Sequence, residues 1–67
     1  MINYGENLKY QRELHKLSQE ELAKQTNIKQ ANISRWEAGN VIPNIDFCVK
    51  LADFYEISLD ELIGREI

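Results

Sequence analysis

The chain has 67 residues, 43% of them hydrophobic and 28% charged, with a formal net charge of −3. Residues 1–67 therefore fit one small domain, whose core supplies only about 3 to 5 kcal/mol of stability unless oligomerisation supplements it. No apolar run is long enough for a membrane span or a signal-peptide core, so we expect a cytoplasmic protein. The single cysteine, Cys48, excludes an intramolecular disulfide, and its apolar neighbours favour a buried thiol.

The first two helices are predicted from apolar spacing and a capping signal. One runs from Gly5 to His15, with Leu8 facing the core. The next begins at Ser18, whose side chain can cap the backbone N–H groups while Glu21, three residues later, caps back. This pattern fixes the start of the second helix.

A tight turn is predicted to join the second helix to a third. Asn27 tolerates the left-handed backbone that such a turn needs, and the small Ala23 lets the two helices cross closely. Ile28 and Ile33 anchor the third helix inward, and Trp36 is a partly buried wedge. The outward face is then polar and rich in donors, of the kind that can enter a DNA major groove: Lys29, Gln30, Ala31, Asn32, Ser34 and Arg35.

Two further helices complete an all-α, five-helix fold. Asn44 caps a fourth helix that runs to about Tyr55, with an inward stripe formed by Ile45, Cys48, Leu51, Ala52 and Tyr55. Ser58 and Glu61 repeat the capping box and start a fifth helix, with Leu62 inward and its end at Gly64.

The combined pattern resembles the helix-turn-helix family of phage repressors and Cro, the xenobiotic-response-element family. The resemblance covers about residues 5–64 and rests on Gln19, Ala23, Ile28, Ile33, Trp36-Glu37, Gly39, Pro43, Leu51-Ala52, Ile57-Ser58 and Leu62. It implies a compact bundle of the lambda-repressor type that binds double-stranded DNA. We therefore expect a sequence-specific transcriptional regulator, a repressor, that reads the major groove with residues 29–37 and needs no cofactor, metal or catalysis.

The expected contacts to DNA follow from this arrangement. Gln30 can pair with adenine, Arg35 with guanine, and Ala31 can touch a thymine methyl group. The full set expected to contact bases is Gln19, Lys29, Gln30, Ala31 and Arg35. The set expected to contact the DNA backbone is Ser18, Asn32, Ser34, Asn40 and Asn44.

Three positions carry alternatives. In the family the glutamine matching Gln19 contacts phosphate or a base edge, although a solvated side chain is the alternative. Lys29 stands where a serine or threonine cap is usual, so the third helix should start less firmly while the lysine gains a reach to phosphate. Gln11 stands where the family has an apolar residue, so either it finds a partner or the core is looser there.

The resemblance also implies a structural ion pair. The family pattern pairs the arginine matching Arg12 with the glutamate matching Glu37, which ties the first helix to the end of the third. A phosphate contact is the alternative for Arg12. We favour the structural role.

The net charge argues against DNA binding, because nucleic-acid-binding domains are usually basic. Its distribution changes this reading. Residues 1–35 carry six Lys or Arg against four Glu, whereas residues 36–67 carry two Lys or Arg against seven Asp or Glu. We expect modest non-specific affinity and a shallow salt dependence.

Phe47 and Phe54 lie seven residues apart and therefore on one face of the fourth helix. Either they thicken the core or they form an exposed apolar patch, and we favour the patch. With the C-terminal apolar residues they would form a two-fold dimer interface of Phe47, Phe54, Leu59, Ile63 and Ile67. Such a homodimer would bind a palindromic operator with half-sites about 34 Å apart.

Other classes of function fit the sequence less well. His15 is the only histidine, so neither a His-based metal site nor an enzyme is expected, and no small-molecule substrate is indicated. The alternative that we retain is a protein-interaction module, such as an antitoxin or anti-repressor, whose acidic C-terminal half binds a partner protein.

Overall fold

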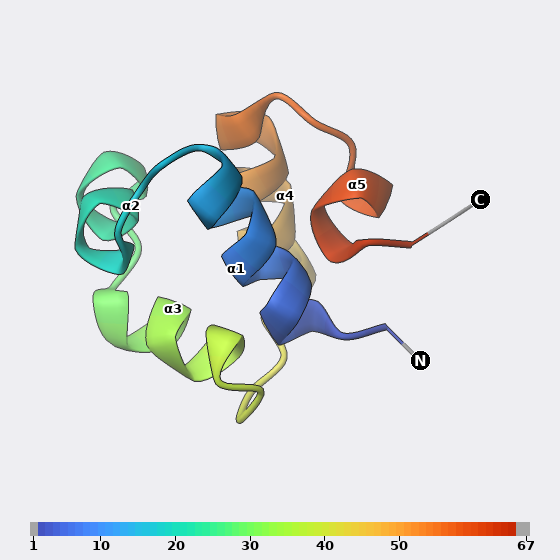
Figure 1. Cartoon of the computed structure of the whole chain (residues 1–67), viewed down its shortest axis with the longest axis horizontal. Coiled ribbons are helices and arrows are strands. Elements are labelled where there is room, and N and C mark those ends of the chain that lie inside the picture. Colours follow the sequence, from blue (N-terminus) through green and yellow to red (C-terminus); the bar gives the residue numbers. More distant parts are fainter. Residues whose placement is uncertain (1, 66–67) are drawn as a thin grey trace.

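The computed structural model describes residues 2–65, which form five α-helices and no β-strand (Figure 1). The helices are α1 (Tyr4–Leu14), α2 (Gln19–Thr26), α3 (Gln30–Glu37), α4 (Ile45–Tyr55) and α5 (Leu59–Ile63). The predicted all-α, five-helix fold is therefore confirmed. None of the helices within these residues is long and apolar enough to cross a membrane.

One core joins all five helices. Helix α1 packs against α3 on one side and α5 on the other, while α2 packs on α3 and α4 (Figure 1). The buried apolar residues are Leu8, Leu22, Ile28, Ile33, Trp36, Cys48, Leu51, Ala52, Tyr55 and Leu62. The predicted inward positions of Leu8, Ile28, Ile33 and Leu62 are confirmed, and Trp36 is more deeply buried than a partial wedge.

The helix ends follow the local signals in the sequence. The Ser18 hydroxyl accepts from the Glu21 N–H, and the Glu21 carboxylate accepts from the Ser18 N–H, so the predicted capping box is present. Asn27 ends α2 in the left-handed region at φ 59°. Lys29 makes no side-chain cap, as expected, and α3 begins at Gln30 without one. The turn between α2 and α3 therefore consists of three residues, Asn27, Ile28 and Lys29.

Helix α1 approaches the end of α3 very closely at Gly5. A Cβ at this position would lie 2.6 Å from the carbonyl oxygen of Trp36 and 2.9 Å from that of Glu37. Such distances are shorter than van der Waals contact, so any larger side chain would push the two helices apart. Gly5 therefore sets the distance at which α1 supports α3.

The fourth helix differs from its prediction in two ways. Ile45, expected to face inward, is 64% exposed at the first position of α4. Phe47 and Phe54 are partly buried and pack against the core, with ring centroids 5.0 Å from Trp36 and 5.2 Å from Tyr55 respectively. The prediction that they form an exposed patch was wrong, because Phe47 packs on Trp36 of α3 and both rings pack against the core.

Candidate nucleic-acid interface

Helix α3 has one face buried and one face open to solvent. Ile33 and Trp36 hold it against the core, and Trp36 also packs on Phe47 of α4. Four of the predicted DNA-contacting residues lie exposed on its outer face: Gln30, Ala31, Ser34 and Arg35. Lys29 is exposed just before the helix, whereas Asn32 is half-buried. The structure therefore presents amide, hydroxyl and guanidinium groups on a helix whose position is fixed from behind.

An ion pair fixes the C-terminal end of α3. The Nε and Nη2 atoms of Arg12 donate to the two carboxylate oxygens of Glu37, at 2.7 and 2.9 Å. The side chains are only 11% and 5% exposed, respectively. The hydrogen bond with Glu37 is the main reason that the pKa of Arg12 is raised, so the guanidinium stays charged. This bidentate geometry makes the pair both strong and directional.

Arg12 also reaches the segment that leads into α2. Its Nη1 atom donates to the backbone carbonyl of Leu17 at 2.7 Å. One guanidinium thus connects α1, the start of α2 and the end of α3. With all three nitrogens engaged inside the protein, Arg12 occupies the structural position that we favoured over a phosphate contact.

Gln19 is part of the same network. Its Nε2 atom donates to Oε1 of Glu37 at 3.1 Å, and its side chain is half-buried. This hydrogen bond holds the amide beside α3 and leaves its Oε1 atom and one N–H for other partners. The side chain of Gln19 is therefore held by Glu37 and is only partly exposed to solvent.

A shallow hollow of about 280 Å³ lies between α1, α2 and α3, beside the hydrogen bonds that join Arg12, Gln19 and Glu37. It is lined by Lys9, Arg12, Gln19, Ser34, Glu37 and Ala38. Because Arg12 and Glu37 neutralise each other, Lys9 is the lining residue that adds a positive charge. Lys9 was not among the residues predicted from the sequence to contact DNA. Its signal was the spacing of three residues to Arg12, which places both on one side of α1.

The remaining residues predicted to contact the DNA backbone have different surroundings. Ser18 and Asn44 are exposed, but their side-chain oxygens accept from backbone N–H groups at the starts of α2 and α4. Each still has a donor group, a hydroxyl or an amide, for an outside partner. Asn40 is exposed in the loop between α3 and α4.

The structure does not gather the predicted dimer residues into one patch. Phe47, Phe54 and Ile63 are half-buried, Leu59 is exposed at the start of α5, and Ile67 lies outside the described residues.

Within residues 2–65, no group of three or more His, Cys, Asp or Glu side chains is placed to hold a metal ion.

The tight turn between α2 and α3, together with the open face of α3, defines a helix-turn-helix unit inside a five-helix bundle. A family model described as helix-turn-helix matches residues 8–62. The chain belongs to the helix-turn-helix family.

Similar proteins include both curated sequences and a solved structure. The HTH-type transcriptional activator BcrR of Enterococcus faecalis is 32% identical over 65 residues, which are 97% of this chain and 32% of BcrR. The cryptic phage CTXphi transcriptional repressor RstR of Vibrio cholerae is 37% identical over 60 residues, which are 90% of this chain and 54% of RstR. A crystal structure of a transcriptional regulator from Listeria innocua superposes with a TM-score of 0.80 at 26% identity, over 96% of this chain and 60% of that one. The chain thus spans about a third of BcrR and about half of RstR.

Proposed function

We propose that this protein is a sequence-specific transcriptional regulator that binds double-stranded DNA by placing α3 in the major groove. The observation that carries the proposal is the exposed polar face of α3, held in position by Ile33, Trp36 and the Arg12–Glu37 pair. Membership of the helix-turn-helix family and the regulators among its relatives support the same function. Since one relative is named an activator and the other a repressor, the proposal concerns operator binding and applies to either sign of regulation.

In this proposal Gln30 and Arg35 make the main base contacts. An amide can bond both N6 and N7 of adenine, and a guanidinium can bond O6 and N7 of guanine. Further base contacts at the edges of this face come from Gln19, Lys29 and Ala31. The DNA backbone is contacted by Ser18, Asn32, Ser34, Asn40 and Asn44. A homodimer would place two copies of α3 on a palindrome with half-sites about 34 Å apart. The protein acts by binding, in the cytoplasm, and catalyses no reaction.

Selection of bound duplexes from a random pool, carried out at two salt concentrations, tests the proposal. We expect an enriched palindrome with half-sites about one helical turn apart. Gln30→Ala should lower affinity by about 1 to 3 kcal/mol and relax the preference at one base pair of each half-site. Lys50→Ala, a change of an exposed residue on α4, is the control and should leave the preference unchanged. Absence of any enriched sequence would refute the proposal and favour the antitoxin or anti-repressor alternative.

A further inference from the structure

The buried carboxylate of Glu37 has two side-chain partners. Its Oε1 atom accepts from Nη2 of Arg12 at 2.9 Å and from Nε2 of Gln19 at 3.1 Å. Its Oε2 atom accepts from Nε of Arg12 at 2.7 Å. Carboxylate oxygens accept hydrogen bonds and donate none, so Gln19 must turn its NH₂ group, and not its carbonyl oxygen, toward Glu37. The chemistry of Glu37 therefore fixes the direction of the Gln19 amide.

Arg12 holds this arrangement from two sides. Its Nη1 atom donates to the carbonyl of Leu17, two residues before Gln19, at 2.7 Å. One guanidinium thus holds both the backbone that leads into Gln19 and the carboxylate that binds the Gln19 side chain. The Glu37 side chain is only 5% exposed, so water competes little for its oxygens. A side chain held in advance in this way loses less conformational entropy when it binds a partner.

The groups that Gln19 keeps free indicate what it binds. With one N–H on Glu37, the amide still has its Oε1 atom, which is an acceptor, and one N–H. A phosphate has only acceptor oxygens, so a contact to phosphate would leave Oε1 without a partner. The base donors in the major groove are the exocyclic amino groups, N6 of adenine and N4 of cytosine. The free oxygen of Gln19 therefore matches a base that carries such an amino group.

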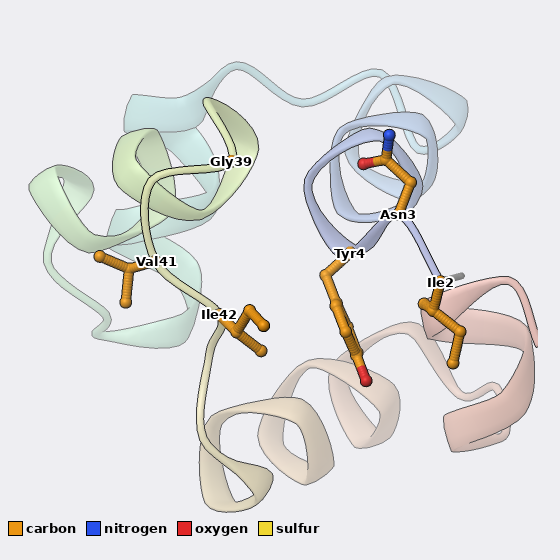
Figure 2. A pocket seen from close by; sticks show the side chains of 6 residues that line it. All are labelled: Ile2, Asn3, Tyr4, Gly39, Val41 and Ile42. Atoms are coloured by element: carbon orange, nitrogen blue, oxygen red, sulfur yellow. The ribbon is translucent and has the colours of Figure 1, made fainter.

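Gln19 lies where DNA bound to α3 would pass. The hollow that it lines also contains Ser34, which is exposed on the outer face of α3. A larger hollow, of about 410 Å³, lies between the start of α1 and the loop after α3 (Figure 2). None of the described residues that line it is charged, and the side chain of Asn3, its one amide, already accepts from the backbone N–H of Glu6. The hollow at Gln19 is thus the one that places an oriented amide beside α3.

We propose that Glu37 is a positioning residue for DNA recognition, which holds Gln19 so that Oε1 accepts from the exocyclic amino group of an adenine or a cytosine. The inference rests on the proposed function, because α3 must lie in the major groove for Gln19 to reach a base. It extends that function by naming the chemical group that Gln19 recognises and the residue that orients Gln19.

The first test removes the amino group from the DNA. At each base pair of the selected half-site, adenine is replaced by purine, or cytosine by the analogue that lacks N4. At one base pair wild type should lose about tenfold in affinity, whereas Gln19→Met should bind both duplexes equally to within about twofold. Gln25→Met, at an exposed glutamine of the same helix, is the matched control and should discriminate as wild type does. Equal discrimination by wild type and Gln19→Met at every base pair would overturn the proposal.

The second test asks whether Glu37 sets the direction of the amide. Glu37→Gln puts an amide in place of the carboxylate, and an amide can accept or donate, so Gln19 can turn either of its ends toward it. The discrimination at the base pair found in the first test should fall from about tenfold to about threefold or less. A purely structural role for Glu37 predicts instead an equal loss of affinity for all duplexes with the discrimination unchanged, and that result would contradict the positioning role.

Arg12→Lys provides the same measurement if Glu37→Gln does not fold. It weakens the hold on Glu37 without removing the carboxylate, so it should lower the discrimination at the same base pair. Unchanged discrimination in this variant would count against the proposal in the same way.

These outcomes differ from a failure of the proposed function. Absence of any enriched duplex would overturn both, since the inference rests on that function. An enriched duplex whose amino groups matter equally to wild type and to Gln19→Met would overturn the inference alone.

Discussion

The hydroxyl group of Tyr55 is the buried polar side-chain group that lacks a hydrogen-bond partner within residues 2–65. The ring itself is well packed, with His15 stacked on it at a centroid distance of 4.4 Å and Phe54 against its edge. Burial, and then the negative charge of Glu37, raise the pKa of Tyr55 to about 12. The ring therefore stabilises the core, while the unpartnered hydroxyl opposes folding.

Tyr55→Phe should leave the free energy of unfolding unchanged or raise it by up to about 1 kcal/mol at neutral pH, because it removes only the unpaired hydroxyl. The pH dependence follows from the raised pKa. Because the folded state disfavours the ionised form of the hydroxyl, this group adds no pH dependence below its ordinary pKa of 10, and stability falls as the pH rises from 10 to about 12. The variant should therefore lose less stability than wild type in this range.

Urea unfolding of both proteins at neutral pH and near the upper end of this range measures the difference. Tyr10→Phe, a change at an exposed tyrosine, is the control and should behave as wild type. Burial also raises the pKa of the Cys48 thiol, but Cys48 is present in all three proteins and cancels in the comparison. Equal losses of stability in Tyr55→Phe and wild type would contradict this account of the hydroxyl.

Between elements, the strongest directional contact is the one that Arg12 makes with α3 and with the Leu17 carbonyl. Arg12→Lys keeps the positive charge but loses the planar guanidinium group, so the lysine cannot form all three of the hydrogen bonds to Glu37 and Leu17. We expect a loss of about 1.5 to 3 kcal/mol in the free energy of unfolding.

Lys24→Ala is the control for this prediction. It removes an ion pair with Glu20 whose side chains are 75% and 68% exposed, and such pairs contribute about 1 kcal/mol or less. Chemical denaturation of the two variants compares a buried pair with an exposed one in the same fold. If both variants lost the same stability, Arg12 would not connect the helices in the way the geometry indicates.

The sequence predicted the helices well because their ends depend on neighbouring residues. Ser18, Glu21 and Asn27 act over one turn, and the structure uses each of them as the pattern indicates. Lys29 likewise starts α3 without a cap. Lys16 adopts φ 57°, a left-handed conformation that glycine adopts more easily than lysine. Local signals therefore sufficed for element order and for the turn that defines the motif.

Contacts between distant elements were harder to predict. The spacing of Phe47 and Phe54 placed them correctly on one face, but it could not show that Trp36 of α3 packs on Phe47 or that Phe54 packs against the core. Helical periodicity placed Ile45 with the inward residues of α4, although at the start of this helix its side chain is 64% exposed. The bond from Gln19 to Glu37 depends on how α2 packs on α3. The place of Lys9 depends on how α1 crosses α3, which Gly5 permits.

At the scale of the whole molecule, positive and negative charges are distributed unevenly along the sequence. Six of the eight basic residues lie in residues 1–35, and seven of the eleven acidic ones lie in residues 36–67. Helices α1 and α2 and most of α3 thus fall in the more basic part of the sequence, while α4 and α5 fall in the acidic part. An acidic protein can bind DNA in this way because the contacts depend on local charge and because repulsion from the acidic part favours one orientation.

This separation predicts which lysines affect the salt dependence of DNA binding. Lys9 lines the hollow beside Gln19 and Ser34, so we expect it to neutralise one phosphate in each protomer. Lys9→Ala should therefore reduce the slope of log affinity against log salt concentration by about 0.9 per protomer. Lys50→Ala removes an equally charged, exposed residue from α4 and should leave the slope unchanged. Titration of the selected duplex at several salt concentrations measures both slopes, and equal reductions would mean that net charge, rather than the placement of Lys9 beside α3, governs binding.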